Sequence, residues 1–389
     1  MIIKSLLDTD LYKYGMLNAI LEHCKRTNID IPIVQYRFKC RNKKNVLQYK
    51  DKIHKEIEAF KKLDFAVDEF DYLESLNLFS PDFFDYIENI NLQDVSVGMY
   101  DVGGELQIDI EGSWATAILF EVPVLAIVNE IYFKNMTIDK KDMEKRLDKF
   151  LSEMIVGQMV FTDFGTRRRF SKTWQKRCIR KAMNEGIITG TSNVLMAMET
   201  GLKPVGTMAH EWLQAFQVLS KNLEDFQIDA LNSWMLTYRG KLDTALTDIV
   251  GIDAFLDDWD SFFMNNYSSL RHDSGCPFKF VDKVIKKYVD NDRTGTDIPR
   301  LLFSDGLTPA LCRKIKKYCK DNWVNYAFGI GTNFTNNTNE EALQIVIKLA
   351  KVNGQDVIKL SDSKGKAMTT NSNMIKKLKE TFGLTTEGK

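Results

Sequence analysis

Hydrophobic segments and amphipathic helical segments alternate along the chain from about residue 160. The run MVFTDFG predicts a strand, and SKTWQKRCIRKAMNEG, with apolar residues at helical spacing, predicts the helix after it. The same order continues through IITG and SNVLMAMETG, PVGTMAH and EWLQAFQVL, TALTDIV and IDAFLDDW, YSSLRHDSG and FKFVDKVIKKYV, RLLFSDG and TPALCRKIKKYC, and finally WVNYAFGIGTN. Strands alternating with helices of this length predict parallel βαβ units. About seven such units over residues 160–340 fit a (β/α) barrel or an incomplete one.

Residues 1–159 have a different, mixed pattern. IPIVQYRFKCR predicts a strand, and DVSVGMYDVGGELQIDIEGSW predicts a hairpin around its Gly-Gly pair. YKDKIHKEIEAFKKL, DEFDYLESL and PDFFDYIENI predict helices. The apolar run AILFEVPVLAIVNEIYF predicts a helix interrupted by Pro123. These elements predict an N-terminal α+β domain.

The tail, residues 341–389, contains QIVIKLAKVNGQDVIKLSD, which predicts a hairpin with Asn353-Gly354 as its turn. We expect this hairpin and the helix after it to pack with the N-terminal domain rather than to complete the barrel. The predicted fold class is therefore α/β: an irregular (β/α) barrel over residues 160–340, joined to an N-terminal α+β domain over residues 1–159.

The charges of the chain balance. Lys and Arg total 53, as do Asp and Glu, so the formal net charge is zero and no general attraction to nucleic acid or to an anionic membrane is expected. The six cysteines form no C-x-x-C pair and have no histidine at zinc spacing, which indicates reduced thiols. The N-terminus lacks the apolar run of a signal peptide, and no apolar stretch of membrane-spanning length stands out. We therefore expect a cytoplasmic protein.

Unusual polar clusters follow the predicted strands. They are TDFGTRRR, TGTSN, GTMAHE, RHDSG, FSDGL and FGIGTN. Each alone is compatible with an ordinary turn, because Gly, Ser, Asp and Asn are common turn residues. In parallel α/β folds, however, ligands bind where the carboxyl ends of the strands converge. The clusters together therefore predict one binding site at this rim.

Two of these clusters favour phosphate. Arg167, Arg168 and Arg169 precede a predicted helix, and guanidinium groups match phosphate oxygens. A solvated basic helix start is the other interpretation. The glycines of FGIGTN would let phosphate approach the backbone, but Phe334 stands where a dinucleotide fingerprint needs its third glycine. The chain also has no G-x-x-x-x-G-K-[ST] motif, which excludes a P-loop nucleotidase.

His210 is one of four histidines, and it lies between a predicted strand and a predicted helix. A zinc-protease H-E-x-x-H motif is excluded because residue 214 is Gln. A hydrogen-bonded core histidine and a catalytic histidine both stay open, the latter for proton transfer or nucleophilic attack on phosphorus. In the strand RHDSG, alternation places Arg271 and Asp273 on one face and His272 on the other. We therefore assign Arg271 and Asp273 to the site and His272 to packing.

Asp273, Asp305 and Tyr12 each have more than one interpretation. Asp273 and Asp305 follow separate strands, where they would hold ribose hydroxyls, ligate Mg²⁺ beside a phosphorylated substrate, or cap the next helix. Tyr12 would stack on a ligand or pack inward on an amphipathic helix.

Taken in order, these segments resemble the nicotinate phosphoribosyltransferases of the compact bacterial and fungal type. The matching segments run from residue 9 to about residue 366 and are TDLYKYGM, EVPVLAIVNE, DFGTRRRFS, GTSNVLMA, GTMAHEWLQA, ALTDIVGIDAF, RHDSG, FSDGL, FGIGTN and VIKLSDSKGK. The resemblance implies a type II phosphoribosyltransferase fold, an α/β barrel joined to an N-terminal α+β domain. Cys276 and Lys364 depart from the pattern, which has Asp and Pro at these positions.

The resemblance also implies an activity. The family makes nicotinate mononucleotide and pyrophosphate from nicotinate and phosphoribosyl pyrophosphate, with Mg²⁺ and with ATP as a co-substrate. ATP hydrolysis is coupled through a phosphorylated histidine, which corresponds to His210. The pyridine ring is held between two aromatic rings, which correspond to Tyr12 and Phe164. In the family this tyrosine comes from the neighbouring subunit, which implies a homodimer with shared active sites.

The remaining implied roles form two sets. The nicotinate-binding set is Tyr12, Phe164, Arg167 and Thr191, and the phosphoribosyl pyrophosphate-binding set is Arg167, Arg271, Asp273, Asp305, Gly306, Gly331 and Thr332. His210, Arg271 and Asp273 are the implied catalytic residues.

Two alternatives stay beside this interpretation. Nicotinamide phosphoribosyltransferases need an acidic acceptor for the amide near the GTSN segment, where this chain has Thr191, Ser192 and Asn193. A non-catalytic barrel that senses nucleotides would tolerate the loss of His210 and the arginines, yet the chain keeps all of them.

Overall fold

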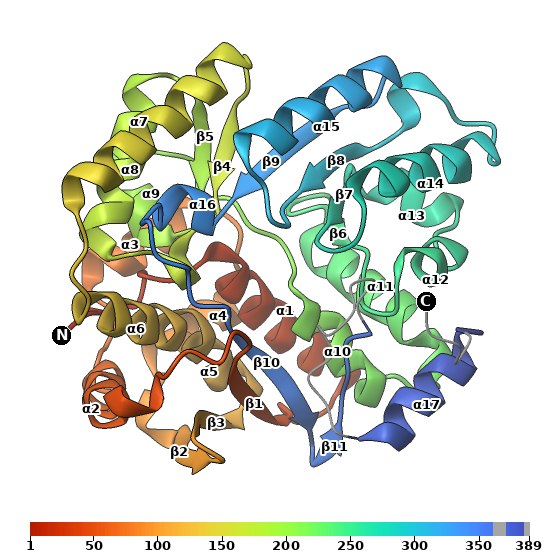
Figure 1. Ribbon diagram of the computed structural model, residues 1–389. Helices are drawn as coiled ribbons and strands as arrows, with labels where there is room; N and C mark the ends of the chain where they lie inside the picture. Colours follow the sequence, from red (N-terminus) through yellow and green to blue (C-terminus); the bar gives the residue numbers. More distant parts are fainter. Residues whose placement is uncertain (361–370, 385–389) are drawn as a thin grey trace.

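A six-stranded parallel sheet forms the centre of the C-terminal half of the protein (Figure 1). The structure is a computed structural model that describes residues 1–360 and 371–384. The strand order is β5-β4-β9-β8-β7-β6. The strands are β4 (Phe161–Asp163), β5 (Ile188–Thr191), β6 (Thr244–Leu246), β7 (Ser269–His272), β8 (Arg300–Phe303) and β9 (Tyr326–Ile330). The parallel sheet predicted from the alternating pattern is confirmed.

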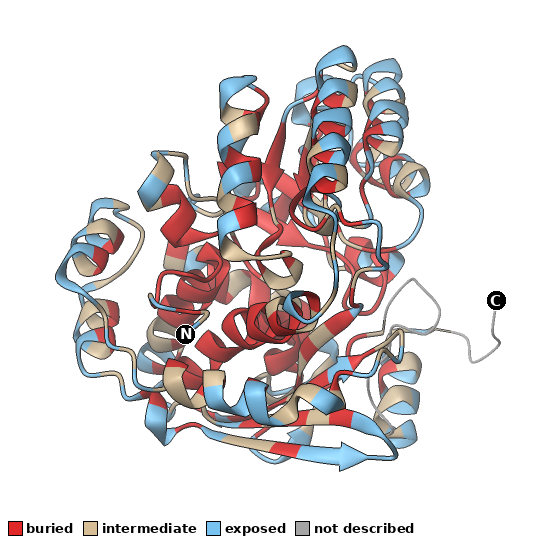
Figure 2. Cartoon of the chain, turned by 60° about the vertical axis from the view of Figure 1, so that its left-hand side comes forward, coloured by how far each residue is buried: buried red, intermediate tan, exposed pale blue. Residues whose placement is uncertain are grey.

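Helices follow the strands of this sheet and cover it. They are α8 (Lys172–Asn184), α9 (Val194–Thr200), α10 (His210–Leu219), α11 (Phe226–Tyr238), α12 (Ile252–Asp257), α13 (Ser261–Asn266), α14 (Pro277–Val289), α15 (Pro309–Asp321) and α16 (Thr332–Thr335). The Ser171 hydroxyl accepts the backbone N–H of Trp174 and caps α8, and Gly201, in the left-handed conformation, ends α9. Figure 2 shows buried residues on the strands and on the inner sides of these helices, whose outer sides are exposed.

The predicted strand over residues 204–210 is wrong. Among the described strands, β5 and β6 are the two edges of the sheet, and an irregular segment lies between them. The Val205 N–H donates to the carbonyl of Thr191 (2.9 Å). The Thr207 hydroxyl donates to the carbonyl of Thr244 (2.9 Å). A Cβ added to Gly206 would lie 2.7 Å from the backbone nitrogen of Tyr12, so the start of α1 packs where a regular strand would place side chains.

A five-stranded antiparallel sheet, in the order β11-β10-β1-β3-β2, forms the other half of the protein. Its strands are β1 (Ile33–Cys40), β2 (Ser96–Val102), β3 (Glu105–Ser113), β10 (Ile345–Val352) and β11 (Gln355–Asp356). The hairpin predicted at Asn353-Gly354 is confirmed, and both residues have the positive φ that its turn requires. Because β10 pairs with β1, the C-terminal segment joins the N-terminal sheet.

Helices from the first part of the chain surround this sheet. They are α1 (Leu11–Thr27), α2 (Lys50–Phe60), α3 (Val67–Ser75), α4 (Pro81–Glu88), α5 (Trp114–Ala117) and α6 (Glu121–Lys134). The next helix, α7 (Lys140–Val156), packs instead on the parallel sheet, where the Phe150 ring centroid lies 5.6 Å from that of Phe161 in β4. The interruption predicted at Pro123 is the 3₁₀ turn Ile118–Phe120, which joins α5 to α6. The combined segment Trp114–Lys134 is long and apolar enough to span a membrane, contrary to our expectation, but 89% of its apolar window is buried inside the protein. It therefore has the burial of a core helix.

The last described helix is α17 (Ser372–Thr381), and its N-cap residue Asn371 donates through Nδ2 to Oδ2 of Asp356 in β11 of the antiparallel sheet (2.5 Å). The ring of Phe382 at its end meets Phe226 of α11 edge to face, with 5.5 Å between ring centroids. Residues 361–370, including Lys364, lie outside the described part of the chain.

Candidate active site

Two adjoining cavities lie where the carboxyl ends of the barrel strands face the N-terminal half. The outer cavity has a volume of 570 Å³ and lies between the strand-end loops and β10. The inner cavity has a volume of 500 Å³ and extends among the barrel strands. Both are lined by Phe164, Arg167, Ala209, His210, Arg271 and Asp273. The site predicted at this rim therefore has a cavity large enough for small-molecule substrates.

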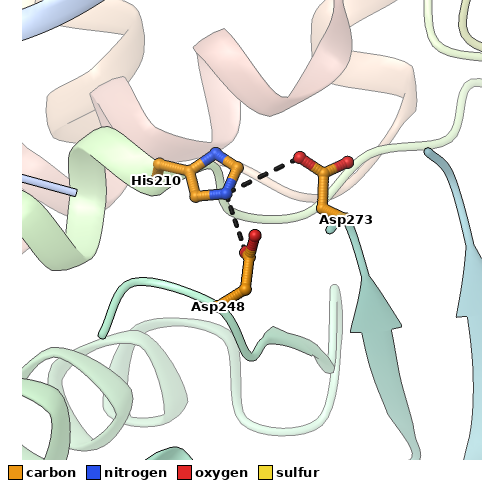
Figure 3. A group of neighbouring side chains, drawn as sticks. All are labelled: His210, Asp248 and Asp273. Atoms are coloured by element: carbon orange, nitrogen blue, oxygen red, sulfur yellow. Dashed lines mark hydrogen bonds and ion pairs between the residues drawn. The ribbon is translucent and has the colours of Figure 1, made fainter. Parts of the chain in front are cut away.

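His210 begins α10 and lies between two carboxylates (Figure 3). Its Nε2 atom is 2.8 Å from Oδ1 of Asp248 and 3.6 Å from Oδ2 of Asp273. The Lys359 ammonium lies 2.6 Å from the same Nε2 and 2.5 Å from Oδ2 of Asp248. Ser274 donates a hydrogen bond to Asp248 as well (2.6 Å). Among the described residues, the polar contacts of the imidazole thus fall on Nε2, and the Lys359 ammonium lies beside it.

Burial and the Lys359 ammonium lower the pKa of His210, although Asp248 and Asp273 oppose them. Burial acts to raise the pKa of Asp248, but His210 and Lys359 hold it well below its ordinary value. At neutral pH the site therefore contains a neutral imidazole beside anionic carboxylates. A neutral imidazole is the form that can act as a nucleophile.

Arg271 and Asp273 face the cleft from β7, as predicted. The guanidinium donates through Nη2 to Oδ1 of Asp273 (2.8 Å) and through Nε to the Ser304 hydroxyl (2.8 Å). His272 points to the other face, where its ring centroid lies 5.2 Å from that of Phe280. The alternation of the strand therefore separates the site residues from the packing residue, and the packing role of His272 is confirmed.

The inner cavity contains both predicted aromatic residues. Phe164 follows β4, and a Cβ added to Gly329 would lie only 2.3 Å from the Phe164 ring, so the glycine makes room for this ring. Tyr12 reaches the same cavity from the start of α1 in the same chain. The expectation that a neighbouring subunit supplies this tyrosine stays a prediction, and the structure shows Tyr12 of the same chain lining the cavity.

Arg167 also lines the inner cavity, and its partner was not predicted from the sequence. Its Nη1 lies 3.3 Å from Oε1 of Glu121. The Tyr12 hydroxyl lies 3.5 Å from Oε2 of the same carboxylate. Glu121, at the start of α6, therefore orients both a cationic and an aromatic side chain of the cavity.

Positive groups gather along the outer cavity. Arg168 donates through Nε and Nη2 to the carbonyl of Ile345 in β10, and Arg41 follows β1 nearby. Burial, together with the neighbouring charges of Arg167 and Arg41, lowers the pKa of Arg168 to about 10. Buried cations that crowd one another are stabilised by an anion, so the cavity suits a phosphorylated ligand. The predicted loop residues Asp305, Gly306, Gly331 and Thr332 line the same cavity.

Comparison with known proteins agrees with this geometry. Residues 159–386 match the nicotinate phosphoribosyltransferase (NAPRTase) family, and residues 7–129 match the nicotinate phosphoribosyltransferase (NAPRTase) N-terminal domain. The chain is 42% identical to a nicotinate phosphoribosyltransferase of Xanthomonas campestris pv. campestris over 395 residues, which cover 99% of this chain and 97% of the relative. It is 43% identical to a nicotinate phosphoribosyltransferase of Neisseria meningitidis serogroup A over 399 residues, which cover 98% of this chain and 97% of the relative. The chain belongs to the nicotinate phosphoribosyltransferase family.

Solved structures of the family have the same fold. A crystal structure of nicotinate phosphoribosyltransferase from Vibrio cholerae has a TM-score of 0.91 at 33% identity and covers 99% of this chain and 95% of its own. A crystal structure of nicotinate phosphoribosyltransferase from Porphyromonas gingivalis has a TM-score of 0.88 at 31% identity, and the match covers 98% of this chain and 100% of the other. The type II phosphoribosyltransferase fold and the enzymatic nature of the chain follow from this membership.

One predicted site residue does not reach the cavities of this family member. Thr191 is fully buried and donates its hydroxyl to Oδ2 of Asp163 (2.8 Å). Its neighbour Ser192 lines the inner cavity instead and donates to Oδ1 of Asp10 (2.8 Å). Adjacent residues at a strand end point to opposite sides, so Ser192 and not Thr191 faces the cavity, and the nicotinate-binding role of Thr191 stays a prediction. Cys276 is exposed at the start of α14, and neither cavity includes it in its lining.

The cluster at His210 does not fit a resident metal ion. His210, Asp248 and Asp273 offer ligand atoms that lie within 4.8 Å of one another. The Lys359 ammonium, however, already contacts both His210 and Asp248. Mg²⁺ also prefers an octahedral set of oxygen ligands, which an imidazole and an ammonium do not supply.

Proposed function

We propose that the chain transfers the phosphoribosyl group of phosphoribosyl pyrophosphate to nicotinate and couples this step to ATP hydrolysis through phosphorylation of His210. The products of the transfer are nicotinate mononucleotide and pyrophosphate, as in NAD biosynthesis and salvage. The observation that carries the proposal is the position of His210, which lines both cavities and contacts Asp248, Asp273 and Lys359.

Nicotinate binds in the inner cavity in this proposal. Phe164 and Tyr12 supply two aromatic rings, and offset stacking on an aromatic ring contributes roughly 0.5–1.5 kcal/mol beyond burial of area. Arg167 supplies a forked donor set for the nicotinate carboxylate. Glu121 supports this role because it orients Arg167 without occupying all of its donors.

Phosphoribosyl pyrophosphate binds in the outer cavity. The glycine-containing loops at residues 306 and 331–332 allow phosphate to approach the backbone, and Arg271 supplies positive charge. The reaction builds positive charge at the ribose C1 as pyrophosphate leaves, and Asp273 and Asp305 lie where they can stabilise it. Mg²⁺ enters in this proposal as an ion carried by the substrate phosphates.

ATP phosphorylates the Nδ1 atom of His210 in this proposal. Asp248 and Lys359 enclose Nε2, which leaves Nδ1 for the phosphoryl group. Its lone pair attacks the γ-phosphorus, the bond to the bridging oxygen breaks, ADP leaves with that electron pair, and the Nε2 proton passes to Asp248. The phosphorylated ring adds negative charge that Lys359 and Arg271 can balance. Hydrolysis of the N–P bond then returns phosphate and the neutral imidazole.

A nicotinamide substrate is the second candidate because an acidic residue does lie near the GTSN segment. Asp10 lines the inner cavity and accepts the hydroxyl of Ser192, so it could accept an amide N–H. Initial rates with nicotinate and with nicotinamide at equal concentration separate the two. The proposal requires the acid to react faster and is overturned if the amide does.

The cytoplasmic location and the homodimer are separate proposals from the family resemblance. Tyr12 lines the inner cavity of its own chain, so the homodimer rests on the family resemblance alone. Light scattering of the purified protein tests the assembly directly.

Release of pyrophosphate from nicotinate and phosphoribosyl pyrophosphate, with and without ATP, tests the reaction. We expect ATP to stimulate the wild-type rate and His210→Ala to abolish the stimulation. The coupling proposal fails if His210→Ala keeps the wild-type response to ATP.

A further inference from the structure

Lys13 is a buried cation that lies beneath the inner cavity. Its side chain is 0% exposed, and its Nζ lies 2.6 Å from Oε2 of Glu121. It also forms an ion pair with Oε1 of Glu211, the residue after His210. Burial acts to lower the pKa of Lys13, but Glu121 and Glu211 outweigh it and raise the pKa, so the ammonium stays charged. A cation held this firmly between two carboxylates fixes their positions.

The carboxylate of Glu121 connects Lys13 to the inner cavity. One of its oxygens contacts Lys13, and the other lies 3.3 Å from Nη1 of Arg167. Lys13 also lies against the Tyr12 ring, with Nζ 5.3 Å from the ring centroid. Both groups assigned to nicotinate on this side of the cavity therefore touch the Lys13–Glu121 pair.

The charges of this cluster balance within the protein. Lys13 and Arg167 carry positive charge, whereas Glu121 and Glu211 carry negative charge. Lys13 is the one ion-pair partner of Glu211 among the described residues. Burial raises the pKa of this carboxylate, whereas Lys13 and a hydrogen bond from Tyr36 act to lower it. Glu211 thus balances the charge of Lys13 but forms no ion pair with Arg167 among the described residues.

We propose that Lys13 is a positioning residue for nicotinate binding, acting through Glu121 on Arg167 and through direct contact on Tyr12. The inference rests on the proposed placement of nicotinate in the inner cavity. Lys13 does not line either cavity and does not touch the substrate. Its role differs from simple charge balance, because it holds one oxygen of Glu121 and leaves the other oxygen to Arg167.

Two variants separate positioning from charge balance. Lys13→Met leaves two buried carboxylates with Arg167 alone and is expected to lower the melting temperature. Lys13→Met combined with Glu211→Gln restores a neutral cluster, because one cation and one anion are removed together. We expect the double variant to regain most of the melting temperature but to keep a KM for nicotinate at least about tenfold above wild type.

The KM for phosphoribosyl pyrophosphate should stay within about twofold of wild type in the double variant, because Gln keeps the size of Glu211 in the outer cavity and the proposed phosphoribosyl pyrophosphate residues are unchanged. Lys25→Met, on the exposed side of the same helix, is the matched control and should change neither KM. A folded double variant with the wild-type KM for nicotinate overturns the inference, because charge balance would then explain Lys13 fully.

Arg167→Met distinguishes failure of this inference from failure of the proposed site. If Arg167→Met raises the KM for nicotinate and the double variant does not, nicotinate binds as proposed and Lys13 has only a structural role. If Arg167→Met leaves the KM for nicotinate unchanged, the proposed placement of nicotinate is wrong and the inference about Lys13 falls with it.

Discussion

Nε2 of His210 and Oδ1 of Asp248 lie 2.8 Å apart, and the aspartate is almost completely buried. The carboxylate fixes the orientation of the imidazole and can accept its proton when the other ring nitrogen is phosphorylated. This relationship connects the end of β6 to the start of α10, two elements that the chain joins only through the intervening helix α11.

Asp248→Asn should slow ATP-dependent phosphorylation of His210 by about 10–100-fold, because an amide cannot accept the proton in the same way. The KM for nicotinate should stay near wild type, since Asp248 lines neither cavity. Rapid-quench measurement of protein-bound phosphate checks the rate. Asp253→Asn, an exposed change, is the matched control. A wild-type phosphorylation rate in Asp248→Asn would remove the proposed role of this carboxylate.

The pH dependence of phosphorylation should report the lowered pKa of His210. Burial and Lys359 lower this pKa, so the nucleophilic neutral ring persists below the ordinary histidine range. Lys359→Met removes one of the causes and should move the acid limb of the phosphorylation rate to higher pH. Lys317→Met, which removes an exposed charge far from the site, should leave the limb in place. A shift to lower pH in Lys359→Met is the contrary outcome.

Gly329→Ala should weaken nicotinate binding, because the new methyl group would lie 2.3 Å from the Phe164 ring and displace it. We expect the KM for nicotinate to rise by about tenfold, which corresponds to about 1.4 kcal/mol, with little change in the KM for phosphoribosyl pyrophosphate. Gly15→Ala is the control, since its added Cβ meets neighbours at 3.5 Å or more. Equal increases in the KM values for both substrates would indicate that the substitution disrupts the whole site and not the nicotinate pocket alone.

Arg169→Met should destabilise the fold by about 3–5 kcal/mol, because it leaves the carboxylate of Asp8 buried without its cation. Arg169 and Asp8 are both 0% exposed, and Nη1 lies 2.6 Å from Oδ1. Arg146→Met, which breaks an exposed pair with Asp142, should cost about 0–1 kcal/mol. Denaturant unfolding of both variants measures the loss of unfolding free energy. Similar losses in the two variants would contradict the stabilising role of the buried Arg169–Asp8 pair.

The Arg169–Asp8 pair should also give the stability a defined pH dependence. Burial acts to raise the pKa of Asp8, but Arg169 outweighs it, and the folded-state pKa lies below the ordinary value of 3.8. The stabilisation from this group is therefore present above 3.8 and is lost as the pH falls through the folded-state pKa. Unfolding free energies should fall less steeply with acid in Arg169→Met than in wild type.

The position of polar residues after predicted strands indicates most of the site, and it also applies to Asp248, which was not identified from the sequence. Asp273 and Asp305 were identified because they follow strands, and Asp248 follows β6 in the same way, so the same signal could have found it. The resemblance assigns Thr191 to nicotinate binding, whereas its neighbour Ser192 is the residue that lines the inner cavity. A shift of one residue at the end of β5 decides which of the two side chains faces the cavity, and the sequence does not specify that shift.

Other features depend on contacts between distant parts of the chain. Lys359 reaches His210 from the segment after β11, and the VIKLSDSKGK segment that contains it does not by itself indicate a contact with the histidine. Glu121 and Lys13 look like ordinary helix residues until α6 and α1 come together. The parallel sheet and the Asn353-Gly354 hairpin, in contrast, rest on local periodicity and turn chemistry, and both were predicted.

Mass spectrometry of the protein after incubation with ATP tests the central proposal most directly. We predict one acid-labile phosphoryl group on the peptide that contains His210, absent in His210→Ala and discharged when nicotinate and phosphoribosyl pyrophosphate are added. Phosphate on another residue, or ATP-stimulated turnover with no phosphate on His210, would contradict the account.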